Sequence, residues 1–136
     1  MLKLNKVNIL SFDLWDADTG EADVTFKFNN TKLKAFSLDD FSNDKEAEVI
    51  LSIFPKEIEI IDNNFENKCE NISNNFQIKL IGDIVDIKSD EEQGDFLIIN
   101  SQDILFSVFI PNNKKEFKIG GKVKILGRLD IEKPVL

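Results

Sequence analysis

The sequence has no histidine, no tyrosine, and only one cysteine, one tryptophan and one arginine among its 136 residues. The absence of histidine removes the usual general base, the Ser-His triad and most zinc sites. The single cysteine, Cys69, cannot form an intrachain disulfide or a thiolate metal cage, and it lacks an imidazole partner that would activate it. We therefore predict no catalytic residue, no metal and no cofactor, and interpret Cys69 as a loop or small core residue.

Long apolar runs are also absent. No stretch approaches the ~20 apolar residues of a membrane-spanning helix. The segment MLKLNKVNIL lacks the apolar centre of a signal peptide, and Asp13 and Asp16 follow soon after it. Together with the low cysteine content, these features predict a cytoplasmic protein without a membrane partner.

Two glycine motifs fail as ligand sites. Gly120-Gly121 lacks the frame of a phosphate-binding loop. Asp16, Asp18 and Gly20 resemble the start of a calcium loop, but the glycine comes one position too early and the twelfth position is Lys27 instead of glutamate. Neither motif predicts a bound phosphate or cation.

Alternation of apolar and polar residues is the strongest structural signal, and it is clearest from Phe76 to Ile131. This period of two is typical of half-buried antiparallel strands. A change of apolar phase after Gly82 indicates a β-bulge in a long, bent strand. Further strands are predicted at 2–14, in a hairpin at 22–37, and at 96–100, 104–110 and 123–131, with a charged hairpin turn at 88–95. Phe117 and Ile119 lead to the last strand through Gly120-Gly121.

The middle of the chain is less clear. Residues 47–54 suit either a short helix or a strand, and Pro55 is expected to end that element. Residues 56–61 alternate like a strand, so that Phe54-Pro55-Lys56 would be a tight link. The asparagine-rich segment 62–75 is predicted to be a surface loop, with at most one helical turn.

The prediction for the fold is a single all-β domain spanning residues 1–136. It would be a partly open antiparallel barrel or a two-sheet sandwich of about eight or nine strands, with at most one short helix. Most of the 12 phenylalanines are expected in the core, because a phenyl ring has no polar tip.

The segment from Phe76 to Ile131 resembles part of an OB-type barrel. The features that carry the resemblance are the long strand bent at Gly82, the hairpin after it, and the late strand from Gly121 to Leu129, which reads GKVKILGRL. The resemblance implies a nucleic-acid-binding face. The chain departs from that pattern because Pro111–Glu116 is too short for the usual helix and no basic face of stacking aromatics is apparent.

Charge is distributed unevenly along the chain. Residues 111–136 carry seven bases against three acids, a net charge of +4, and residues 1–110 carry 10 bases against 22 acids, a net charge of −12. An acidic body repels phosphate backbones and attracts basic partners. Trp15 lies within the densest group of acids, where it would either close one end of the core, the more common role, or serve as a binding hot spot.

Small acidic β proteins that lack cysteine and catalytic residues are similar in style to the immunity proteins of bacterial toxin systems. This resemblance implies a non-enzymatic protein that occludes a basic toxin domain with carboxylates. The predicted partner-binding residues are acids and one aromatic residue in two segments: Asp13, Trp15, Asp16, Asp18, Glu21, Asp23, Asp90, Glu91 and Glu92.

Two alternatives belong to other classes. The first is an OB-like nucleic-acid-binding module that uses Lys122, Lys124 and Arg128 of the basic late strand. Against it, the sole arginine is expected in an ion pair. The second is a structural or assembly protein that offers a free strand edge to a partner.

Overall fold

The computed structural model describes residues 4–72, 76–90, 94–110 and 117–134. These residues form nine strands and no helix, which confirms the predicted all-β class, and therefore no helix among them could cross a membrane. The strands are β1 (Asn5–Leu14), β2 (Ala22–Phe28), β3 (Thr31–Ser37), β4 (Glu46–Ile61), β5 (Lys68–Asn71), β6 (Gln77–Asp90), β7 (Gly94–Ser101), β8 (Ile104–Ile110) and β9 (Lys122–Glu132).

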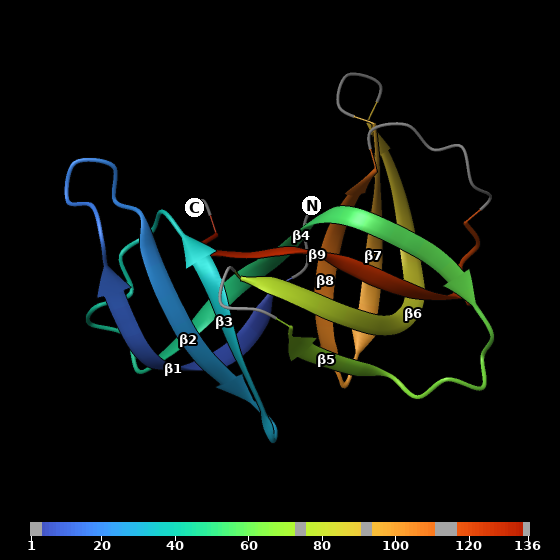
Figure 1. The fold of residues 1–136 in the computed structure, drawn as a ribbon, viewed down its shortest axis with the longest axis horizontal. Helices are drawn as coiled ribbons and strands as arrows, with labels where there is room; N and C mark the ends of the chain where they lie inside the picture. The colour runs from blue at the N-terminus through green and yellow to red at the C-terminus, as the bar shows by residue number, and fades with distance from the viewer. Residues whose placement is uncertain (1–3, 73–75, 91–93, 111–116, 135–136) are drawn as a thin grey trace.

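The strands pair into one sheet in the order β1-β2-β3-β9-β4-β8-β7-β6-β5. Two additional pairings, β1 with β4 and β6 with β9, bend this sheet back on itself. The result is two rings of strands: β1, β2, β3, β9 and β4 form the first, and β4, β8, β7, β6 and β9 form the second. In Figure 1 these rings are the left and right lobes, and β4 and β9 run across both.

Both rings are closed by short stretches of parallel pairing. β3 meets β9 through the single pair Phe36–Asp130, and β8 meets β4 through three pairs that begin at Leu51–Phe106. The other pairings are antiparallel, and the longest joins β4 to β9. Because these parallel contacts comprise only one and three residue pairs, the molecule is a partly open barrel arrangement, as predicted, and not a fully closed barrel.

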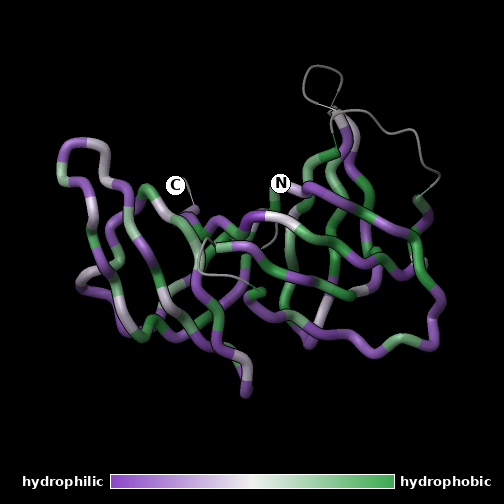
Figure 2. Tube along the Cα trace, in the orientation of Figure 1, coloured by the Kyte–Doolittle hydropathy of each residue, from purple (hydrophilic) through white to green (hydrophobic). Residues whose placement is uncertain are grey.

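Alternation along the strands sends apolar side chains inward. In β2, for example, Val24 and Phe26 are buried while Thr25 and Lys27 are more exposed. Hydrophobic and hydrophilic residues alternate along many strands in Figure 2. The buried side chains of both rings form one contiguous cluster, because β4 and β9 contribute inward residues to each ring. Burying this apolar surface is the main stabilising term.

The middle of the chain corrects one prediction. Pro55 does not end a strand, since β4 continues through it from Glu46 to Ile61. The register with β9 shifts between Pro55 and Glu57, and such a bulge tolerates a residue without an N–H donor. Gly127 lies opposite, where an added Cβ would come within 2.3 Å of the Phe54 carbonyl oxygen. A glycine on β9 therefore lets the bulge of β4 approach closely.

Other expectations are confirmed or refined. The hairpin predicted at 22–37 is β2–β3, and the bulge predicted after Gly82 is a register shift between Ile84 and Asp86. The turn expected at 88–95 is shorter, because β6 continues to Asp90 and β7 begins at Gly94. The predicted loop 62–75 contains a strand, β5, which pairs with β6 and buries Cys69.

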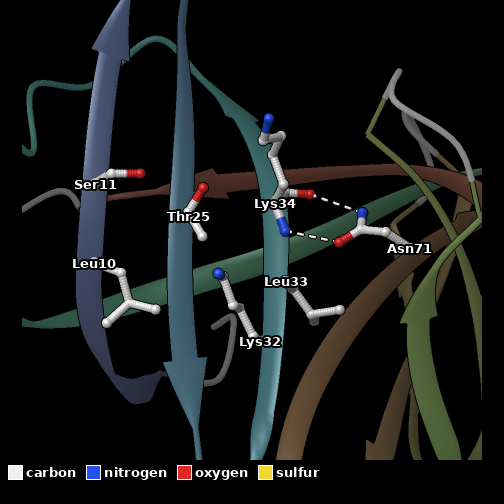
Figure 3. A pocket seen from close by; sticks show the side chains of 7 residues that line it. All are labelled: Leu10, Ser11, Thr25, Lys32, Leu33, Lys34 and Asn71. Atoms are coloured by element: carbon white, nitrogen blue, oxygen red, sulfur yellow. Dashed lines mark hydrogen bonds between the residues drawn. The ribbon is translucent and has the colours of Figure 1, made fainter.

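Two asparagine side chains complete the pairing where strands pass from one ring to the other. The Asn5 amide donates to the Leu105 carbonyl oxygen and its own oxygen accepts from the Leu105 N–H, both at 2.7 Å. Asn71 makes the same two bonds with the backbone of Lys34, at 3.0 and 2.8 Å (Figure 3). Asn5 lies where β1 and β8 pair with successive parts of β4. Asn71 lies beside the part of β3 that has no pairing with β9, because β9 pairs there with β6.

Candidate functional site

Aromatic side chains from four separate segments meet on the surface where the two rings join. The Trp15 ring stacks on Phe76 with 6.3 Å between centroids and 10° between planes, and it meets Phe36 edge-on at 5.8 Å. Phe36 and Phe76 also meet edge-on, at 6.0 Å. Each aromatic pair of this kind contributes roughly 0.5–1.5 kcal/mol beyond its buried area. We call Trp15, Phe36, Phe54, Phe76 and Arg128 the aromatic cluster.

Arg128 ties the cluster to β4. Its guanidinium carbon lies 5.1 Å from the centroid of Phe36 and 4.9 Å from that of Phe54, so that both rings contact the same cation. The same guanidinium donates two hydrogen bonds to the Asp130 carboxylate, at 2.8 and 2.9 Å. The expected ion pair of the sole arginine is therefore present, and it orients a planar group between two aromatic rings.

Phe76 has a backbone conformation that is unusual for a bulky residue, with φ of 62°. Such a conformation is strained and persists where the surroundings hold it in place. Here the Phe76 carbonyl oxygen accepts a hydrogen bond from Leu129, between the points where β9 pairs with β6 and with β3. The strained residue thus lies at the passage of β9 from one ring to the other, and its ring is held against Trp15.

The cluster corrects two predictions about aromatic residues. Trp15 does not close the core, because 53% of it is exposed. Only Phe26, Phe28, Phe41 and Phe106 of the 12 phenylalanines are buried, and Phe54 and Phe65 are about half exposed, so that the expectation of mostly core phenylalanines is wrong. The alternation of the strands predicts an outward position for two residues of the aromatic cluster, because Phe36 follows the inward Ala35 and Phe54 follows the inward Ile53. Phe76 gives the opposite signal, because it is in phase with the buried Ile78 and Leu80, yet it precedes β6 and its ring stacks on the exposed Trp15.

The acidic segment beside the cluster is a turn between β1 and β2. Trp15 and Glu21 are joined by a backbone hydrogen bond of 3.0 Å. The Asp16 carboxylate accepts hydrogen bonds from the N–H groups of Asp18, at 2.9 Å, and Thr19, at 3.4 Å. Asp16 therefore shapes the turn, while Asp18 is exposed at its tip. The turn fixes the position of Trp15 relative to the surrounding carboxylates.

Asp13 and Asp23 face each other directly across β1 and β2. Like charges at directly opposed positions destabilise a sheet. Lys34, which is 3.7 Å from Asp23, relieves part of this repulsion, and Asp13 remains exposed. The segment that carries Trp15 thus has five acids between residues 13 and 23, with no base among them.

The remaining predicted residues are dispersed. Asp90 ends β6 in the other ring, and Glu91 and Glu92 lie outside the described residues. Lys122 is buried, and its ammonium donates to the Phe65 carbonyl oxygen at 2.8 Å and lies 3.6 Å from Asp83. Lys124 faces Glu59 across β9 and β4. The structure therefore brings together only Trp15 and the acids of its own turn.

Within the described ranges, no group of three or more acidic or cysteine side chains is placed to hold a metal ion. Burial, and to a lesser degree the nearby Glu70 carboxylate, raises the pKa of the Cys69 thiol to about 12, so that the thiol is protonated at neutral pH. Exposed aromatics, one arginine and flanking carboxylates are the residue types of protein-binding hot spots and their rims. Comparison of the chain with protein-family models, with curated proteins and with solved structures finds no match.

Proposed function

We propose that this chain is a non-enzymatic protein-binding domain, and that its specific form is an immunity protein that neutralises a toxin domain with a basic surface. The observation that carries the proposal is the aromatic cluster, in which Trp15 and Phe54 are about half exposed. Trp and Arg dominate binding hot spots because they combine large contact area with defined geometry.

The acids around Trp15 fit the specific form. A surface of carboxylates steers a basic partner toward the aromatic anchor and increases the association rate. Carboxylates also imitate phosphate in the basic cleft of a nuclease. The nucleic-acid-binding alternative is less well supported, because Lys122 is buried and the Arg128 guanidinium is already paired with Asp130.

The proposal is tested by affinity capture from the host lysate, followed by reconstitution with the purified candidate. Trp15→Ala should raise Kd by about 30-fold, the effect of losing a hot spot of ~2 kcal/mol. Phe65→Ala is a matched control, since Phe65 is exposed to the same extent, 53%, but lies outside the cluster. Its Kd should equal that of the wild type.

The two parts of the proposal have separate readouts. Asp13→Lys together with Asp18→Lys, both at exposed positions, should slow association and reduce its dependence on salt. For the immunity form, an equimolar amount of the chain should abolish the enzymatic activity of the partner. A partner whose affinity ignores Trp15→Ala would place the contact elsewhere, and a partner without toxic activity would leave a binding domain of another kind.

A further inference from the structure

A groove of about 340 Å³ lies beside the aromatic cluster, on the outer face of the sheet. Phe36 of β3 and Phe54 of β4 line two of its sides. Between these strands runs β9, where Asp130 pairs with Phe36 on one side and with Ser52 on the other. The groove therefore has aromatic walls and a polar floor.

Carboxylates line the groove in excess over cations. Asp130 is paired with Arg128, but Asp39 and Glu132 also line the groove. Asp39 accepts a hydrogen bond from the backbone N–H of Lys133, whose ammonium instead pairs with Asp44 at 2.8 Å. Within the described part of the chain, the Glu132 carboxylate has no ion-pair or hydrogen-bond partner. The groove thus keeps negative charge that the chain does not neutralise.

The pKa of Glu132 reflects burial and that charge excess, whereas the pKa of Asp130 reflects burial. The pKa of Glu132 is raised by burial and then by the Asp39 and Asp130 carboxylates. The pKa of Asp130 is raised by burial, although the Arg128 guanidinium opposes the shift. A cation placed among these carboxylates would offset their repulsion, which adds to the effect of burial on the pKa of Glu132.

The walls suit the same kind of ligand. Phe36 and Phe54 give the groove apolar walls against which the aliphatic stem of a long cationic side chain can pack, while their own cation–π contacts are made by Arg128 at 5.1 and 4.9 Å. Phosphate groups would be repelled by Glu132 and Asp39, which argues against a nucleic acid as occupant. A groove of this size accommodates a single side chain rather than a folded element.

We infer that this groove receives an arginine or lysine side chain from a basic segment of the protein partner. The inference rests on the proposed function and specifies the chemistry of the partner at this point of the interface. The aliphatic stem would lie against Phe54, and the cationic head would lie between the carboxylates of Glu132, Asp39 and Asp130.

The experiment uses the full chain labelled with ¹⁵N and two peptides of identical shape, Gly-Gly-Arg-Gly-Gly and the same peptide with citrulline in place of arginine. Citrulline keeps the planar head group but carries no charge. The arginine peptide should shift the amide signals of Ser52, Asp130 and Glu132 in a saturable manner. The citrulline peptide should not shift them.

Matched variants locate the contact. Glu132→Gln, at an exposed position, should raise the Kd of the arginine peptide by about threefold to fivefold. Asp39→Asn combined with Glu132→Gln should weaken it by about tenfold. Glu59→Gln is the control, because Glu59 is an exposed acid on the same strand as Phe54, about 16 Å along at ~3.3 Å per residue.

Equal shifts with both peptides, or shifts spread over the acidic turn at Asp16 and Asp18, would overturn the inference. Failure of the inference is distinct from failure of the proposed function. If Trp15→Ala weakens binding of the partner but the arginine peptide does not bind in the groove, only the inference is contradicted. A groove that binds arginine, without any partner that depends on Trp15, contradicts only the proposed function.

Discussion

Cys69 shows how the surroundings of one residue set its chemistry. Its thiol is buried between β5 and the core, and its pKa is raised to about 12. A thiol with an ordinary pKa begins to react with alkylating reagents near pH 8, because the thiolate is the reactive form. We expect native Cys69 to remain unlabelled by iodoacetamide up to about pH 10. Chain unfolded in urea should react at the ordinary rate, and rapid native labelling would contradict the burial.

Gly127 is the residue for which the smallest change should have the largest effect. A Cβ at this position would lie 2.3 Å from the Phe54 carbonyl oxygen and 2.9 Å from the Pro55 Cα. Both neighbours are backbone atoms, so relief requires movement of β4. Gly127→Ala should lower the free energy of unfolding by about 3 kcal/mol, measured by urea denaturation.

The control for this substitution is Gly121→Ala. The added Cβ would approach the Lys118 carbonyl oxygen only to 3.1 Å, in a loop before β9. Its cost should be about 1 kcal/mol or less. Equal effects of the two substitutions would show that the bulge of β4 yields readily.

The sequence predicted the part of the site that is local in the chain and did not predict the contacts that depend on the fold. Trp15 and the acids around it form a dense local group, and local groups are visible in a sequence. The contact of Trp15 with Phe36 and Phe76 joins the turn after β1, strand β3 and the residue before β6, so it depends on the fold. Arg128 could be expected in an ion pair, but its place between two rings could not.

At the scale of elements, the paired hydrogen bonds that Asn5 and Asn71 each make with a strand backbone offer a matched comparison. Asn5 is 6% exposed, so its removal would leave the N–H and carbonyl groups of Leu105 without partners in a partly buried place. Asn71 serves Lys34 at an exposed place, where water can replace it. Asn5→Ala should therefore cost about 2–4 kcal/mol and Asn71→Ala about 1 kcal/mol or less, both measured by urea denaturation.

Asn5→Asp refines this test. The carboxylate can still accept from the Leu105 N–H, but it cannot donate to the Leu105 carbonyl oxygen. We expect a loss at least as large as that of Asn5→Ala at pH 7, because a charge is also buried. A smaller loss would mean that water reaches the bridge.

Most elements followed from alternation, and the exceptions follow from interactions distant in sequence. The hairpin β2–β3 and the bulge in β6 have local signals in asparagine, glycine and apolar phase. The continuity of β4 through Pro55 depends on Gly127, which is far along the chain. The sequence did not reveal β5, because a strand of four residues with one buried side chain, Cys69, is too short to show an alternating pattern.

At the scale of the whole molecule, β4 and β9 belong to both rings. Neither ring can unfold alone without losing strands that the other requires. This arrangement supports the prediction of a single domain and implies one cooperative transition. Trp15 fluorescence reports the end of the first ring that contacts Phe76, and the accessibility of Cys69 reports β5 at the edge of the second. Their midpoints in urea should coincide, and two separate midpoints would show that the rings are independent units.

The sharing of β9 also has a consequence for synthesis. β9 is the last of the nine strands in chain order, and it pairs with β3, β4 and β6. A nascent chain that has emerged only through β8 therefore holds two incomplete rings and an unpaired edge along β4. Such edges are templates for association with other chains, and distant pairings form slowly. Folding of this protein must wait for one late segment, and a ribosome that stalls before Lys122 would release an aggregation-prone product.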